Sequence, residues 1–338
     1  MTKRMAHFDI AKAIGIILMI FGHSLKSDNI IRIFIFTFHI PLFFFISGYF
    51  FKAINAELLV KKNFRRLLVP YLFTSLMVIV LSAIYLLISG DHSAVIEKTS
   101  SWAVAAIYGS GRTFNSPIPI RPIGAIWFLL ALFSAEYLFS TFHQKKWILP
   151  IFILLISYIG YSTAKLIWLP FSIQSGMVGI VFMYAGFLFR ENSIFDKKIP
   201  LPFLILGGLV WFICIKYSRL SLVSCTLKNG FLDVIGAVCA IYFIIHFSII
   251  ISRLEILSRI FSYIGRNTLI ILCFHLIELN VFPWKLIRGY LSGFDLSATG
   301  MFWMVMGIKF LWAFSAVLIV NHIKILRQIF FPENKTYV

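Results

Sequence analysis

Two histidines and two charged residues interrupt the apolar beginning of the chain. Asp9 and Lys12 lie in the apolar run that ends at His23, and His39 lies in the next apolar run. A charge at the middle of a bilayer costs roughly 2.5–3.5 kcal/mol, so charged side chains in a spanning helix usually face a site. Because histidine titrates near neutral pH, it suits proton transfer to or from a hydroxyl group. The residue types therefore favour acid–base chemistry inside a membrane.

Helical geometry places the first three of these residues on one stripe. Lys12 and His23 are three turns apart, which leaves their side chains only about 20° apart around a helix. Asp9 falls within about 40° of His23, and the stripe is about 20 Å long. Two interpretations stay open. Asp9 and Lys12 form a simple ion pair at i, i+3, or they belong to a polar track that crosses the membrane.

A third histidine falls at a similar depth in a later run. His275 lies in the outer half of its segment, as His23 and His39 do in theirs, so a shared polar cavity is predicted. Glu136 and Arg266, in or near the apolar runs, are further polar candidates without an obvious partner. The histidines and the four cysteines show no zinc or redox spacing, so no metal site is expected.

Composition identifies the class of protein. Of the 338 residues, 60% are hydrophobic and 13% are charged, and the mean hydropathy is +0.92. These values are typical of a polytopic membrane protein. Each apolar run is long enough to cross roughly 30 Å of hydrocarbon. We therefore expect an all-α transmembrane bundle, a single membrane domain over 1–338, with about ten spanning helices at about 8–25, 31–51, 67–88, 123–142, 147–163, 173–190, 201–217, 230–251, 260–280 and 300–323.

The net charge of +18 is best explained by topology. With the N-terminus inside, more than half of the 31 basic residues fall in inner segments, as the positive-inside rule requires. No basic patch alternates with exposed aromatic residues on a soluble module, so nucleic acid is not expected as a partner. We expect a multi-pass protein in the plasma (inner) membrane of a bacterium, in contact with lipid, with both termini in the cytoplasm.

Two polar segments lie between the apolar runs. The basic cluster at 61–71 is on the inner side, where it contacts lipid headgroups or binds an anionic cofactor; both interpretations stay open. A long outer loop at about 89–122 leads into Trp127, and its glycines and prolines exclude regular helix over 109–122. This loop is either a solvated linker or a lid that touches a substrate.

These segments resemble the membrane-bound acyltransferase 3 family, and within it the fucose O-acetylase-like branch. The resemblance covers most of the chain and is carried by Asp9-x2-Lys12-x10-His23, Phe38-His39-Ile-Pro-Leu-Phe-Phe-Phe-Ile-Ser47-Gly48-Tyr49, Arg65-Arg66-Leu-Leu-Val-Pro-Tyr71, Ile126-Trp127-Phe-Leu-Leu-Ala-Leu132 and Ile264-Gly-Arg-Asn-Thr-Leu269 followed by His275. It implies transfer of an acyl group, usually acetyl from acetyl-CoA, to hydroxyls of cell-surface sugars. The family's Arg-x10-His pair falls on Lys12 and His23. Lysine keeps the positive charge but lacks the two-pronged guanidinium that binds phosphate in a plane.

The resemblance implies an integral-membrane O-acetyltransferase. Acetyl-CoA, the acyl donor, would bind from the cytoplasm near Lys12, Asp9, Arg65, Arg66 and Tyr71. The acceptor, a cell-surface glycan or lipid-linked sugar, would approach from outside past Arg112, Arg121 and Trp127. His23 would act as general base, with His39 or His275 as oxyanion donor or proton relay.

Other mechanisms and functions stay open at this point. Direct transfer and an acetyl-histidine intermediate fit the residues equally well. The alternative function is a transporter or flippase with an intramembrane Asp/Lys/His relay, although the chain shows no internal repeat. A scaffolding function would not explain why three histidines lie at a similar depth in the membrane.

Overall fold

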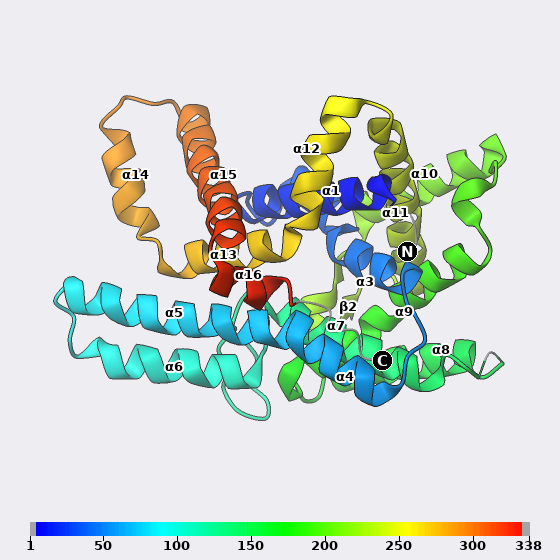
Figure 1. The fold of residues 1–338 in the computed structure, drawn as a ribbon, viewed down its shortest axis with the longest axis horizontal. Coiled ribbons are helices and arrows are strands. Elements are labelled where there is room, and N and C mark those ends of the chain that lie inside the picture. The colour runs from blue at the N-terminus through cyan, green and yellow to red at the C-terminus, as the bar shows by residue number, and fades with distance from the viewer. Residues whose placement is uncertain (1–4, 146, 333–338) are drawn as a thin grey trace.

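The computed structural model describes residues 5–145 and 147–332, and these fold almost entirely into helices (Figure 1). The strands in this part of the chain are a two-stranded antiparallel hairpin, β1 (Leu220–Ser221) and β2 (Thr226–Leu227). Six helices are long and apolar enough to cross a membrane, or seven if one bent pair forms a single span. The predicted all-α polytopic bundle is confirmed.

Each of the ten predicted spans corresponds to helix. The segments that meet the spanning criteria by themselves are α1 (Ala6–His23), α2 with α3 (Ile30–Phe36, His39–Tyr49), α4 with α5 (Ala56–Asn63, Val69–Ile88), α9 (Ile173–Glu191), α11 (Phe231–Ser252) and α15 (Ala298–His322). Three apolar helices are shorter: α7 (Trp127–Phe142), α8 (Leu149–Thr163) and α10 (Leu201–Tyr217). A helix of 16 residues, such as α7, is about 24 Å long, less than the hydrocarbon thickness.

The predicted span at 260–280 is not one straight helix. It consists of α12 (Glu255–Arg266) and α13 (Thr268–Val281), which meet at 63°. The bend falls at Asn267, whose side-chain amide donates to the Tyr263 carbonyl at 2.8 Å and accepts from Asn321 of α15 at 3.2 Å. Asparagine side chains compete in this way with the helical backbone bonds, which the apolar pattern of the segment does not reveal.

The segment at 89–122 is only partly loop. Its first half forms α6 (Ala94–Tyr108), which packs against α5 and buries Trp102 and Ala105. In Figure 1 these two helices lie side by side as a long hairpin. Helix α6 ends at Gly109, which has a φ of +71°, and the following stretch to residue 122 contains no helix, as its glycines and prolines predict.

Short helices complete the fold. They are the amphipathic α14 (Trp284–Ser292), the terminal α16 (Lys324–Phe330), a π-helical turn at Phe64–Leu68 and 3₁₀ turns at Pro170–Ser172, Ile194–Asp196 and Leu222–Ser224. Helix α1 lies at the centre, where it contacts α2, α3, α11, α12 and α13.

Helices α3 and α9 form one of the closest helix contacts. A Cβ on Gly48 of α3 would lie 1.8 Å from the Met183 carbonyl oxygen of α9, so only glycine permits this approach. The Ser47-Gly48-Tyr49 motif therefore serves packing. It also fixes α3, which carries His39 at its first residue, relative to the rest of the bundle.

Candidate active site

A single cavity of about 880 Å³ follows α1 through the bundle. Helix α1 contributes Lys12, Ile16, Met19 and His23 to its lining. Their spacing of four, three and four residues is that of one helix face, as the predicted stripe requires. At 1.5 Å per residue, Lys12 and His23 lie about 16 Å apart along the cavity.

The cavity has two chemically distinct ends, because α1 and α3 run antiparallel beside it. At one end Phe8 of α1 contacts Tyr49 of α3, with 4.4 Å between ring centroids. At the other end the His23 ring lies 5.5 Å from Phe36, whose ring lies 4.5 Å from His39. The first end therefore holds Lys12, and the second holds the histidines.

The histidine end brings together all three histidines that were predicted to share a level. The His23 and His275 rings lie 5.8 Å apart. His23 and His39 line the cavity, whereas His275 lies behind His23 and is 1% exposed. The Nδ1 atom of His39 lies 3.2 Å from the Ile35 carbonyl oxygen. Since a carbonyl only accepts, this nitrogen carries the proton and Nε2 of the neutral ring carries the lone pair.

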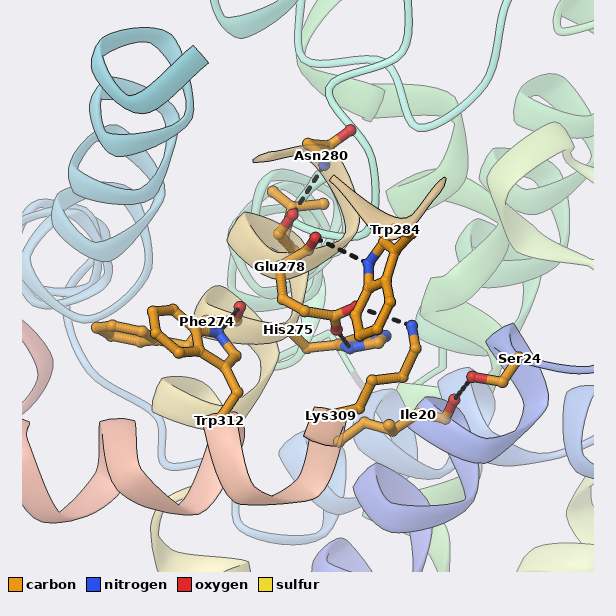
Figure 2. A network of polar contacts seen from close by, with 10 residues as sticks. Ile20, Ser24, Phe274, His275, Glu278, Asn280, Trp284, Lys309 and Trp312 are labelled. Carbon is orange, nitrogen blue, oxygen red and sulfur yellow. Dashed lines mark hydrogen bonds and ion pairs between the residues drawn. The ribbon is translucent and has the colours of Figure 1, made fainter. Parts of the chain in front are cut away.

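His275 belongs to a buried charge network (Figure 2). Its Nδ1 lies 2.8 Å from Glu278 Oε2, and the Lys309 ammonium of α15 lies 2.8 Å from Glu278 Oε1. The indole of Trp284 donates to the Glu278 backbone carbonyl at 3.3 Å, and the Lys309 ammonium lies 4.7 Å from the centre of that ring. In the described part of the chain, His275 Nε2 has no hydrogen-bond partner.

The opposite end of the cavity contains a second buried carboxylate. Glu136 of α7 accepts from Arg66 at 2.5 Å, from Ser47 at 2.5 Å and from Asn63 at 2.8 Å. The carboxylate is nearly inaccessible, with 4% of the residue exposed. Lys12 lies at the same end and forms the predicted ion pair with Asp9 at 2.7 Å, while it also lines the cavity. The ion-pair interpretation is therefore confirmed, whereas the α1 residues that line the cavity between Lys12 and His23 are the apolar Ile16 and Met19.

Comparison with protein families gives a match, which covers most of the chain. The model of an acyltransferase domain, that of acyltransferase 3, matches residues 5–322. The chain belongs to the acyltransferase 3 family. Comparison with curated proteins and with solved structures finds no match. The family identifies this multi-pass membrane protein as an acyltransferase, and the predicted family is confirmed.

The cavity takes in some of the predicted site residues and leaves others outside. His23, His39, Lys12, Arg66 and Trp127 line it, and His275 contacts it through His23. Of the other described residues predicted for the site, Asp9 pairs with Lys12, and Arg65, Tyr71, Arg112 and Arg121 lie outside the lining.

Local structure and contacts explain why these side chains lie inside or outside the cavity lining. Arg65 and Arg66 occupy a π-helical turn, which directs only Arg66 into the cavity and leaves Arg65 exposed. The Tyr71 hydroxyl donates to the Ala106 carbonyl at 2.6 Å and ties α5 to α6. Arg121 stacks 4.0 Å over the ring of Trp102, and Arg112 is exposed at the surface.

Other polar residues in or beside the cavity did not emerge from sequence reasoning. Glu278 and Lys309 were not predicted. A signal for them was present in the sequence, because a glutamate one turn after His275 and a lysine within an apolar helix are costly unless they are paired. Arg32 and Arg219 also line the cavity. Arg32 donates to the Leu25 carbonyl at 2.8 Å and lies 5.0 Å from the Phe36 ring, next to His23. Within the described residues, no group of histidine, cysteine and carboxylate side chains has the arrangement of a metal site.

Proposed function

We propose that the protein transfers an acetyl group from acetyl-CoA to a hydroxyl group of a cell-surface or lipid-linked glycan. One observation carries this proposal: a single cavity joins a cationic end at Lys12 and Arg66 to a histidine end at His23. A two-substrate transferase requires such a passage, because the donor and the acceptor must meet at one general base.

The cationic end suits the phosphates of the donor. Lys12, Lys52, Lys62 and Arg66 line the cavity there, and Glu136 is the acidic residue among the lining groups. Glu136 pairs with Arg66 and Asp9 pairs with Lys12, so Lys52 and Lys62 give this end its net positive charge. In our proposal this end faces the cytoplasm of a bacterium, at its inner membrane, and the pantetheine arm extends along Ile16 and Met19 toward His23.

The histidine end suits the chemistry. His23 removes the proton of the acceptor hydroxyl while the hydroxyl oxygen forms a bond to the acetyl carbonyl carbon. The carbon–sulfur bond breaks, and the proton passes from His23 to the CoA thiolate. Neutral His39 presents a lone pair at Nε2, because its Nδ1–H is used on Ile35, so it acts as an acceptor and not as an oxyanion donor.

The acceptor enters beside Trp127, Arg32 and Arg219. Trp127 begins α7 and lies nine residues, about 14 Å, from Glu136, so it belongs to the histidine end. Gly111 and Val223 pack around its indole, which brings the loop after α6 and the segment that carries Arg219 to this entrance. The two arginines provide donors for sugar oxygens or for the phosphate of a lipid-linked sugar.

Membranes that contain the wild-type protein, His23→Ala or His246→Ala test the proposal with acetyl-CoA labelled in the acetyl group. His246 of α11 is the matched control, because it is a helix histidine outside the cavity lining. We expect label in glycan, or in free acetate by hydrolysis, for wild type and His246→Ala but not for His23→Ala. Equal transfer by His23→Ala would exclude His23 as the base.

A transporter or flippase with a proton relay remains the alternative function. The two functions differ in ligand, because a transporter of sugars or lipids has no reason to bind CoA. Purified protein should bind CoA with an affinity that falls in Lys12→Ala. Absence of both CoA binding and turnover would favour the transporter.

A further inference from the structure

The ring of His275 is held in one protonation pattern by residues that do not touch the cavity. Figure 2 shows His275 and Glu278 on the same turn of α13, with Lys309 reaching them from α15. An ionised carboxylate only accepts, so the 2.8 Å contact places the proton on His275 Nδ1. Its Nε2 then carries a lone pair.

This lone pair is buried and has no partner among the described residues. Burying a hydrogen-bonding atom without a partner costs about 1–3 kcal/mol, so such an atom calls for an explanation. His23 is the neighbouring ring, with 5.8 Å between ring centroids. Two imidazoles joined by an N–H···N bond have centroids about 5–5.5 Å apart. A small rotation of His23 closes this gap, as catalytic hydrogen bonds often do when substrates bind.

Burial of the ion pair between Glu278 and Lys309 carries a desolvation cost, so the pair is an inefficient means of stabilising the contact between α13 and α15. The pair is almost fully buried, with side-chain exposures of 0% for Glu278 and 6% for Lys309. A buried ion pair often contributes no more stability than apolar residues of the same volume. Structural need alone therefore does not account for these charges, whereas the fixed tautomer of His275 does.

We propose that Glu278 and Lys309 are positioning residues that keep His275 as a hydrogen-bond acceptor for His23. Lys309 keeps Glu278 ionised, Glu278 keeps the proton on His275 Nδ1, and His275 Nε2 accepts an N–H from His23. This inference rests on the proposed function, with His23 as the base.

The chain Lys309–Glu278–His275–His23 acts when His23 takes the hydroxyl proton of the acceptor. At that moment the acceptor oxygen–carbon bond forms, the carbon–sulfur bond of acetyl-CoA breaks, and His23 becomes an imidazolium ion. The hydrogen bond from the second N–H of this imidazolium to His275 Nε2 is then at its strongest. His23 afterwards gives the acceptor's proton to the thiolate sulfur, and the relay residues return to their starting state.

Kinetics of two variants separate positioning from mere structure. Glu278→Gln removes the charge, and the double variant Glu278→Leu with Lys309→Met removes the pair without leaving a lone buried charge. We expect both to lower kcat by about 10²-fold with KM for acetyl-CoA within about threefold. The double variant should retain the wild-type thermal midpoint. Asn321→Ala, which removes another polar contact of the bent α12–α13 pair with α15, is the matched control and should keep wild-type kcat.

One further measurement completes the test. In ¹⁵N-histidine-labelled protein, the signals that disappear in His275→Asn should show a protonated Nδ1 and an unprotonated Nε2. Wild-type kcat in the folded double variant, or a proton on Nε2, would overturn the inference. Turnover that depends on His23 but not on Glu278 would refute this inference alone, whereas turnover independent of His23 would refute the proposed function.

Discussion

Arg66 Nη2 lies 2.5 Å from Glu136 Oε1, so a salt bridge joins the turn before α5 to the middle of α7. Ser47 of α3 and Asn63 of α4 bind the same carboxylate. Two separate segments, α3 and the continuous helix from α4 through the π-helical turn, therefore converge on one buried anion at the cationic end of the cavity. Glu136 both fixes these segments and offsets one of the positive charges that line this end.

Removal of the Arg66 side chain should destabilise the protein. Arg66→Ala leaves the Glu136 carboxylate buried without its cation, at a cost of roughly 2–3 kcal/mol, less than for a fully buried pair because solvent reaches Arg66. Arg65→Ala is the matched control, since Arg65 is exposed one residue away. Thermal unfolding in detergent should show a lower midpoint for Arg66→Ala only. Equal midpoints would contradict the role of the bridge.

The same two arginines should differ in their effect on the donor. Arg66 lines the cavity and Arg65 does not, so Arg66→Lys, which keeps the charge opposite Glu136, should raise KM for acetyl-CoA severalfold. Arg65→Lys should leave KM unchanged. If Arg65→Lys raised KM more than Arg66→Lys, the donor would bind elsewhere on the basic cluster.

At the opposite end, the arginines of the cavity should determine acceptor binding. Arg32→Ala and Arg219→Ala should each raise KM for the acceptor by about 10-fold, the loss of one charged hydrogen bond of about 1.5 kcal/mol. Arg112→Ala, an exposed arginine outside the lining, serves as the control. Initial rates at varied acceptor concentration would show this, and a larger effect at Arg112 would move the acceptor site to the outer loop.

Close packing of α3 on α9 should tolerate no side chain at position 48. Gly48→Ala would force a methyl group against the Met183 carbonyl and destabilise the protein by about 1–3 kcal/mol or more. Gly208→Ala in α10 is the control, because the nearest atom to its Cβ, from Phe243, lies 3.8 Å away. Folded yield and thermal midpoint should fall for Gly48→Ala and stay unchanged for Gly208→Ala.

Hydropathy and helix geometry predicted much of this fold and part of the site. Each of the ten apolar runs corresponds to helix, and six or seven of these segments are long and apolar enough to cross a membrane. Lys12 and His23 share a face because the spacing within one helix fixes it. The similar depth of the three histidines was predicted from their positions along spans of assumed direction. The His23 and His275 rings lie 5.8 Å apart, and Phe36 lies between the rings of His23 and His39.

The features of the fold and the site that were not predicted depend on contacts between helices and on how the helices are rotated relative to each other. The contact of Glu278 with Lys309 joins two helices, and no pattern within either helix sets their mutual rotation. Which of Arg65 and Arg66 lines the cavity depends on the π-helical turn that contains them. The bend at Asn267 depends on the hydrogen bonds of its side chain. Arg121, predicted to contact the substrate, stacks on Trp102 of a helix that was not predicted and lies outside the cavity lining.

One experiment separates the two ends of the cavity most directly. CoA binding by isothermal titration and acetyl transfer from labelled acetyl-CoA would be measured on the same preparations of wild type, His23→Ala and Lys12→Ala. His23→Ala should bind CoA as tightly as wild type but transfer no acetyl group, whereas Lys12→Ala should bind CoA more weakly. Loss of CoA binding in His23→Ala together with unchanged binding in Lys12→Ala would contradict the assignment of donor and base to opposite ends.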